Sequence, residues 1–196
     1  MAIDEEIRDH LLSAISLAVR SGLGTETEVI EGIEQRVEDE LGDSDPQLVR
    51  ELEAEARRLL AAQHAEELTW TGPSTNEAIE RAFEELNENG LVALENAGYT
   101  QSDGWSDAKE VAGDRDAPPR GAVFYHGQDL AQGVAGEGLY LTFGAYADGE
   151  EASLAIAREV CETLASHGVE TSWDGSTKTR ILIPPFPWRR RRQGSE

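Results

Sequence analysis

His126 is the residue whose type and position are most typical of a functional site. It follows the apolar run AVFY (122–125) and precedes Gly127, so we expect it at the end of a strand, beside a turn. An imidazole there can act as a general acid or base near neutral pH, and Asp129 could orient it. The alternative is structural: the ring bonds a backbone carbonyl, and Asp129 caps a short helix from Leu130. We favour this alternative, because no nucleophile or second base stands at a recognisable spacing.

The other reactive side chains form no motif. The remaining histidines are isolated, which argues against a metal site, and the single cysteine, Cys161, falls on an apolar helical stripe as a small core residue would. The acidic groups at 38–40 and 43–45 lack the calcium-binding loop pattern and indicate solvated surface. The glycines at 133–138 match no phosphate-binding loop. We therefore assign no catalytic residue, metal or cofactor, and keep His126 and Asp129 as candidates.

Two clusters of charged residues need separate interpretations. Arg189–Arg192 could bind an anion or a nucleic acid, but a net charge of −22 repels phosphate backbones, so we expect no nucleic-acid partner. We expect the run to fold onto the acidic helices of its own chain or to be solvated. Asp174 and Arg180 flank a predicted hairpin, and an ion pair between them would fix it, with Trp173 packed in the core.

The charge balance is the strongest signal in the composition. The 196 residues include 39 acidic and 17 basic side chains, an excess that steers a protein towards basic surfaces. We therefore expect a protein-binding role with a basic partner, such as that of a bacterial immunity protein or antitoxin. Solubility without a specific partner and nucleic-acid mimicry remain alternatives. The sequence has no apolar run of the ~18–20 residues that span a membrane, and its acidic start is unlike a signal peptide. A cytoplasmic monomer is the expectation.

The elements that must position these residues fall into two parts. Residues 1–70 have apolar side chains at helical spacing and predict about three acidic helices, with helix starts indicated at Thr25 and Asp45. Thr71–Ser74 forms the clearest break. We expect an α+β domain over 74–192 and a disordered tail over 193–196.

Short apolar runs separated by turns predict the sheet of the second domain. A helix begins at Ser74, and a second helix covers about 151–167. Strand, helix and strand over 139–173 imply a crossover between parallel strands, whereas the last two strands form an antiparallel pair. The expected fold is a mixed sheet of about five strands covered by helices, with strands at 91–94, 122–125, 139–143, 169–173 and 180–183.

Four segments carry a family resemblance: FYHGQD (124–129), GLYLTFG (138–144), SWDGSTKTRI (172–181) and PWRRR (187–191). Over about 76–192 the chain resembles an uncharacterised bacterial domain family of unknown function, which implies a fold but no activity.

A second resemblance involves Tyr140. His126-Gly127 and Gly138-Leu139-Tyr140 are similar to elements of ADP-ribosyltransferases, in which the histidine and tyrosine hold the nicotinamide nucleotide. Here only 14 positions separate the two residues, and no later glutamate stands in an acceptor motif. An enzyme with a site around His126 and Tyr140 is therefore the alternative to a binding protein.

Overall fold

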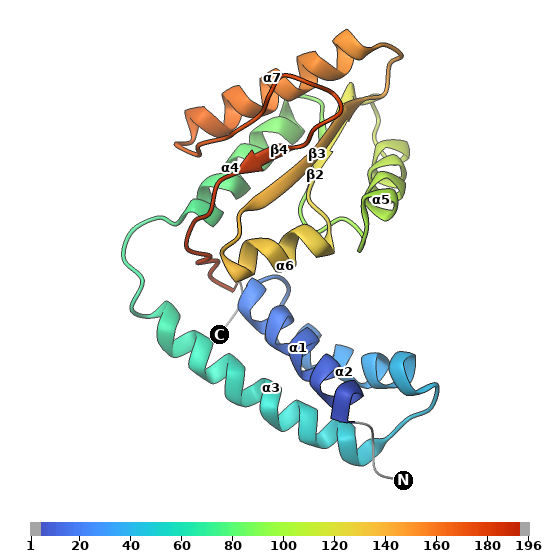
Figure 1. Ribbon diagram of the computed structural model, residues 1–196, viewed down its shortest axis with the longest axis vertical. Coiled ribbons are helices and arrows are strands. Elements are labelled where there is room, and N and C mark those ends of the chain that lie inside the picture. The colour runs from blue at the N-terminus through green and yellow to red at the C-terminus, as the bar shows by residue number, and fades with distance from the viewer. Residues whose placement is uncertain (1–4, 193–196) are drawn as a thin grey trace. The chain divides into compact units, whose positions relative to one another are not determined.

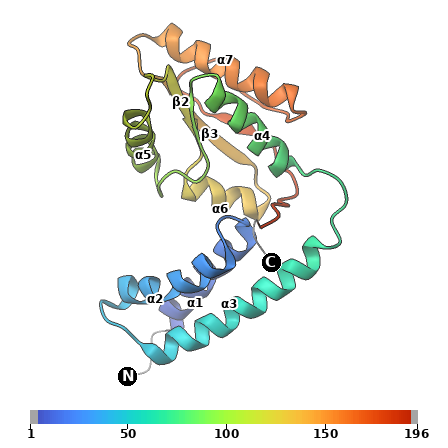
Figure 2. The same ribbon diagram turned by 180° about the vertical axis from the view of Figure 1, so that it is seen from behind.

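The computed structural model describes residues 5–192, which form two compact units (Figures 1 and 2). The helical unit comprises residues 5–72 together with 189–192, and the α+β unit comprises residues 73–188. Residues 1–4 of the predicted helical part and the predicted tail 193–196 lie outside the described chain.

The helical unit contains the three helices that the sequence predicts: α1 (Glu5–Ser21), α2 (Glu26–Leu41) and α3 (Pro46–Glu67). Thr25 and Glu28 form a reciprocal capping box that starts α2, and the Asp45 side chain accepts two backbone N–H groups at the start of α3. The apolar stripes of the helices face one another. Their shared core consists of Leu11, Ile15, Val19, Ile33, Val37, Leu48, Leu52, Ala56 and Leu60.

The arginine run packs into this helical unit rather than into the α+β unit. Arg192 is 8 % exposed, and its guanidinium donates to four backbone carbonyls at and after the end of α1, over 2.5–2.9 Å. Burial lowers the pKa of Arg192, and the carboxylates of Glu67, Glu26 and Glu28 oppose that effect. The last carbonyls of a helix have no partner within the helix, so a buried guanidinium is suited to them. Arg192 therefore caps α1 from the far end of the chain.

The α+β unit has a mixed sheet of four strands in the order β1-β2-β3-β4. β1 and β2 are parallel, and the other two pairs are antiparallel. The helices α4 and α7 lie on one face and α5 on the other (Figure 1). In chain order the elements are α4 (Thr75–Glu88), β1 (Val92–Leu94), α5 (Gln101–Gly113), β2 (Gly121–Phe124), α6 (Gly127–Ala135), β3 (Leu139–Ala145), α7 (Glu150–Ser166) and β4 (Ile181–Ile183).

The predicted α+β class is confirmed, but the strand count is corrected from about five to four. Residues 169–173 form no strand, because the N–H of Val169 closes α7 by bonding the Leu164 carbonyl at 2.9 Å. Only Ser172 has a bridge partner, Leu182, and that bridge is antiparallel. The predicted parallel crossover over 139–173 is therefore wrong, and the parallel connection is β1-α5-β2.

The helix α5 occupies a segment that the sequence analysis treats as a connection. Its start is fixed by a capping box between Thr100 and Asp103. Gly104 lets it pack closely on the sheet, because a Cβ atom there would lie 2.3 Å from Cε2 of Phe124. Trp105 adds an edge-to-face contact with Phe124 at a centroid distance of 5.3 Å.

Candidate functional site

The candidate site lies where the two parallel strands end. The carboxyl ends of β1 and β2 meet at one edge of the sheet, which is where open α/β sheets place ligands. The loops that follow are joined by two backbone hydrogen bonds of 2.9 Å, from Ala97 N–H to the Tyr125 carbonyl and from Gly127 N–H to the Gly98 carbonyl. This brings the first turn of α5 beside the first turn of α6.

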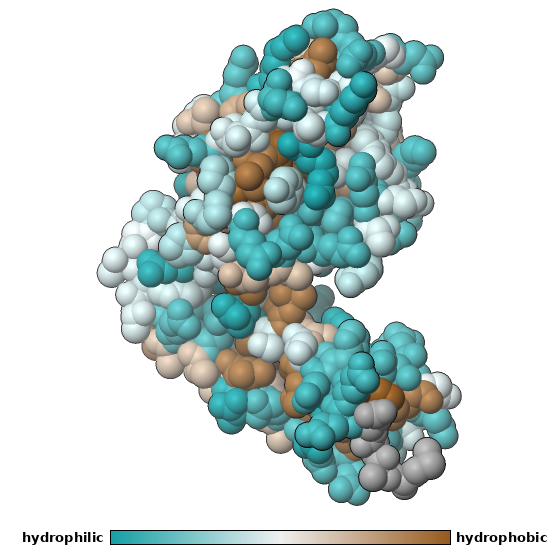
Figure 3. Space-filling view, in the orientation of Figure 1, coloured by the Kyte–Doolittle hydropathy of each residue, from teal (hydrophilic) through white to brown (hydrophobic). Residues whose placement is uncertain are grey.

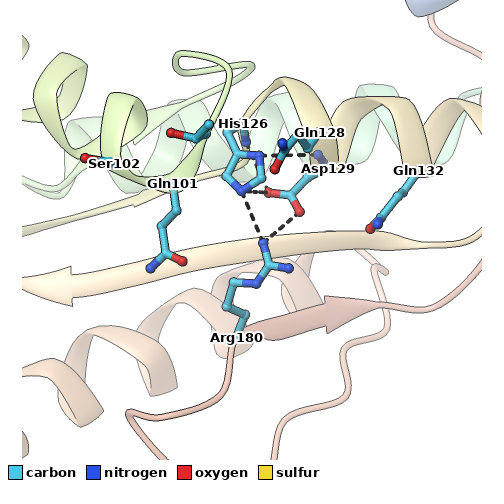
Figure 4. Close-up of a pocket in the computed structure, with 8 residues that line it drawn as sticks. Gln101, Ser102, His126, Gln128, Asp129, Gln132 and Arg180 are labelled. Atoms are coloured by element: carbon cyan, nitrogen blue, oxygen red, sulfur yellow. Dashed lines mark hydrogen bonds and ion pairs between the residues drawn. The ribbon is translucent and has the colours of Figure 1, made fainter.

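An open pocket of about 490 Å³ occupies this edge (Figure 4). Its volume falls in the range of small-molecule sites. Two helix starts supply most of its wall, and Arg180, which directly precedes β4, supplies the rest. The lining residues are Thr100, Gln101, Ser102, His126, Gln128, Asp129, Gln132 and Arg180.

His126 is the N-cap of α6, which corrects the predicted helix start at Leu130 and places Asp129 in the first turn. The ring Nδ1 accepts the Asp129 N–H at 3.4 Å, and the Asp129 carboxylate accepts the His126 N–H at 3.2 Å. The predicted bond from the ring to a backbone carbonyl is therefore wrong, because the ring accepts a backbone N–H instead. The structural role expected of this histidine takes the form of a capping box.

The capping box also defines the protonation state of the ring. Because Nδ1 accepts a hydrogen bond, Nε2 carries the proton and faces Asp129 Oδ2 at 3.1 Å. Burial lowers the pKa of His126; the charge of Asp129 opposes this, Arg180 lowers the pKa further, and Asp103 raises it. Both ring nitrogens of the neutral imidazole are thus engaged with Asp129.

Arg180 completes the site, although the sequence predicts it only as a structural partner of Asp174 and not as a site residue. Its Nη1 donates to Asp129 Oδ1 at 2.7 Å, so the predicted Asp174–Arg180 pair is not formed. Asp174 instead accepts hydrogen bonds from the Thr179 hydroxyl and the Ser176 N–H. A lone arginine at the start of the last strand was the only sequence signal.

Tyr140 contacts the site through Arg180. The guanidinium carbon lies 4.7 Å from the centroid of the Tyr140 ring, a cation–π contact. Tyr140 itself is not among the residues that line the pocket. Nη1 of Arg180 also lies 3.4 Å from Nε2 of His126, so the three candidates His126, Asp129 and Tyr140 all contact Arg180.

Comparison with known proteins gives a family and no function. A family model for a domain of unknown function, DUF6891, matches residues 4–192. The chain belongs to this family. The match extends beyond the predicted 76–192 to include the N-terminal helices, so both units are parts of one family domain. Searches among curated proteins and among solved structures found no match.

The other reactive side chains lie apart from this pocket. Within residues 5–192, no three histidine, cysteine or acidic side chains form a group that could hold a metal ion. Burial raises the pKa of the Cys161 thiol. His167 contacts Glu85 at 2.8 Å, and the half-buried Trp173 makes a T-shaped ring contact with Phe143. In the same part of the chain, every helix is too short or too polar to cross a membrane.

Proposed function

We propose that the protein acts by binding rather than by catalysis, and that the pocket of the α+β unit receives a small polar ligand. The observation that carries this proposal is the capping box, in which the polar atoms of His126 and Asp129 are hydrogen-bonded to each other and to Arg180. The remaining lining groups are carboxamides, hydroxyls and a guanidinium. These groups form hydrogen bonds with a ligand but do not transfer protons near neutral pH.

The alternative of an enzyme around His126 and Tyr140 has less support. Because Nε2 already carries a proton, His126 could accept one from a substrate only at Nδ1, and it would have to release the Asp129 N–H to do so. Loss of that N-cap costs about 1 kcal/mol. Tyr140 is turned to Arg180 and has no place in the pocket lining.

A ligand screen with a pocket-blocking variant tests the proposal. Compounds that bind the pocket should shift the backbone amide signals of residues 100–102 and 127–132 in NMR spectra. Ser102→Trp places a large side chain in the pocket without replacing His126, Asp129 or Arg180, and it should abolish the binding. Ser106→Trp is the matched control, because Ser106 is an exposed residue of the same helix outside the pocket lining. Ligands that bind both variants equally well, or a screen without any binder, would contradict the proposal.

A second candidate function is the binding of a basic protein partner, of the immunity or antitoxin kind. Both units are acidic: the helical unit has 17 acidic and ten basic residues, and the α+β unit has 20 and seven. Hydrophilic side chains cover much of the visible face of each unit (Figure 3). The specific observation is on α2, where Glu31, Glu34 and Glu38 share one side of the helix and form no ion pair within the described residues. Such a stripe attracts cationic surfaces.

Two triple variants of equal charge test this second function. Glu31, Glu34 and Glu38 are replaced by Gln in one variant, and the control replaces Glu51, Glu53 and Glu55, which are already paired with arginines. A purified basic partner captured at low salt should bind the first variant more weakly than the control. Equal loss in both variants would show that total charge alone governs capture, and would contradict a specific interface on α2.

A further inference from the structure

We propose that the ligand of this pocket carries a carboxylate, and that this group binds the guanidinium of Arg180. The inference rests on the proposed function, that the pocket receives a small molecule, and it assigns the chemical class. Arg180 has a fixed orientation and N–H donors without a partner among the described residues, and the local charge around it favours such a group.

The orientation of the Arg180 guanidinium is fixed by two neighbours. Asp129 Oδ1 holds Nη1 at 2.7 Å, and the Tyr140 ring lies 4.7 Å from the guanidinium carbon. Asp129 is in turn fixed by the capping box with His126. An arginine that is already ordered loses little conformational entropy when it binds a ligand, which favours binding.

Part of this guanidinium is available to a ligand. An arginine has five N–H donors, and within residues 5–192 the partners of Arg180 account only for Nη1. The side chain of Arg180 is 33 % exposed, whereas that of Asp129 is 2 % exposed, so the pair is buried on the aspartate side and accessible on the arginine side. Figure 4 shows Gln101 and Gln132 on either side of Arg180. Two parallel N–H groups of a guanidinium match the two oxygens of a carboxylate.

The local charge favours a singly charged group. Asp129 is the one acidic residue among those that line the pocket, and its charge is balanced by Arg180, while His126 is neutral. The whole chain carries a net charge of −22, so a doubly charged phosphate would meet stronger repulsion than a carboxylate. The carboxamides of Gln101, Gln128 and Gln132 are suited to hydroxyl or amide groups elsewhere on the ligand.

Titration of the ¹⁵N-labelled protein with acetate tests the inference, with acetamide as a neutral probe of the same shape. Acetate should shift the Arg180 Nε–H signal in a saturable way, and acetamide should not. The Nε–H of Arg158, an exposed arginine paired with Glu151, serves as the internal control for ionic strength. Tighter binding of inorganic phosphate than of acetate would overturn the carboxylate assignment.

The same experiment separates this inference from the proposed function. If a compound from the screen occupies the pocket while acetate leaves Arg180 unchanged, the carboxylate inference fails and the pocket function stands. If no compound binds, the proposed function itself fails. Arg180→Lys keeps the positive charge beside Asp129 but loses the paired donors, and acetate should bind it about tenfold more weakly. A folded Arg180→Lys protein that binds acetate as tightly as the wild type would also overturn the inference.

Discussion

Protonation of His126 should destabilise the α+β unit, and His126→Asn isolates that effect. His126 is 4 % exposed, and its ring caps α6 only while Nδ1 accepts the Asp129 N–H. A protonated ring has a hydrogen on Nδ1, so it can no longer accept, and the cap is lost. Asparagine is also a strong N-cap, and it does not titrate. His126→Asn therefore keeps a capping side chain at this position but removes the group that takes up a proton.

The sign and size of the effect follow from the lowered pKa. Burial and Arg180 lower the pKa of His126, Asp129 and Asp103 oppose them, and the net direction is downward from 6.5. The unfolded chain then binds the proton more readily than the folded chain. The contribution of His126 to stability is complete above about pH 6.5 and falls below it, by up to about 1.4 kcal/mol per pH unit, until the folded pKa is reached.

Urea unfolding of both proteins over a pH series measures this contribution. The difference in the free energy of unfolding between the wild type and His126→Asn should be constant above about pH 7 and should shift against the wild type towards about pH 5. The other histidines are common to both proteins and cancel in the difference. Proton NMR of the imidazole should give a folded pKa below 6.5. A pKa above that value, or a difference that does not change with pH, would refute the capping argument.

Two further substitutions test how the chain is held together. Arg192→Met should destabilise the helical unit by at least about 3 kcal/mol, because four carbonyls lose a buried charged donor. Arg36→Met, at an exposed position of the same unit, should change little, and amide hydrogen exchange of α1 measures both variants. Equal protection of α1 in the two variants would show that the Arg192 hydrogen bonds contribute nothing. Gly104→Ala should lower the free energy of unfolding by about 1–3 kcal/mol, because the added Cβ would lie 2.3 Å from the Phe124 ring. Gly113→Ala is the control in the same helix; it has open space around it and should be neutral or stabilising in thermal unfolding. A stabilising Gly104→Ala would contradict the packing described for α5.

The helix starts could be predicted from the sequence because they depend on contacts within a few residues. Thr25 with Glu28, and Ser74 with Glu77, form the capping boxes that their spacing indicates. At Thr100 the third residue is Asp103 rather than a glutamate, and the two glycines of α5 are typical of a connection, so the sequence did not indicate this helix. Whether such a segment forms a helix depended on the packing of Gly104 against Phe124, a contact with a distant strand.

The sequence by itself determined that His126 would stand at a strand end, since the apolar run before it and the glycine after it are local features. It also determined the acidic character of both units. Only the tertiary structure decided what His126 and Asp129 do, because their third partner, Arg180, lies 51 positions further along the chain from Asp129. The pairing of β4 with β3 brings that arginine to the edge where β2 ends. Ion pairs between distant elements depend on the strand order of the sheet, which spacing along the chain does not encode.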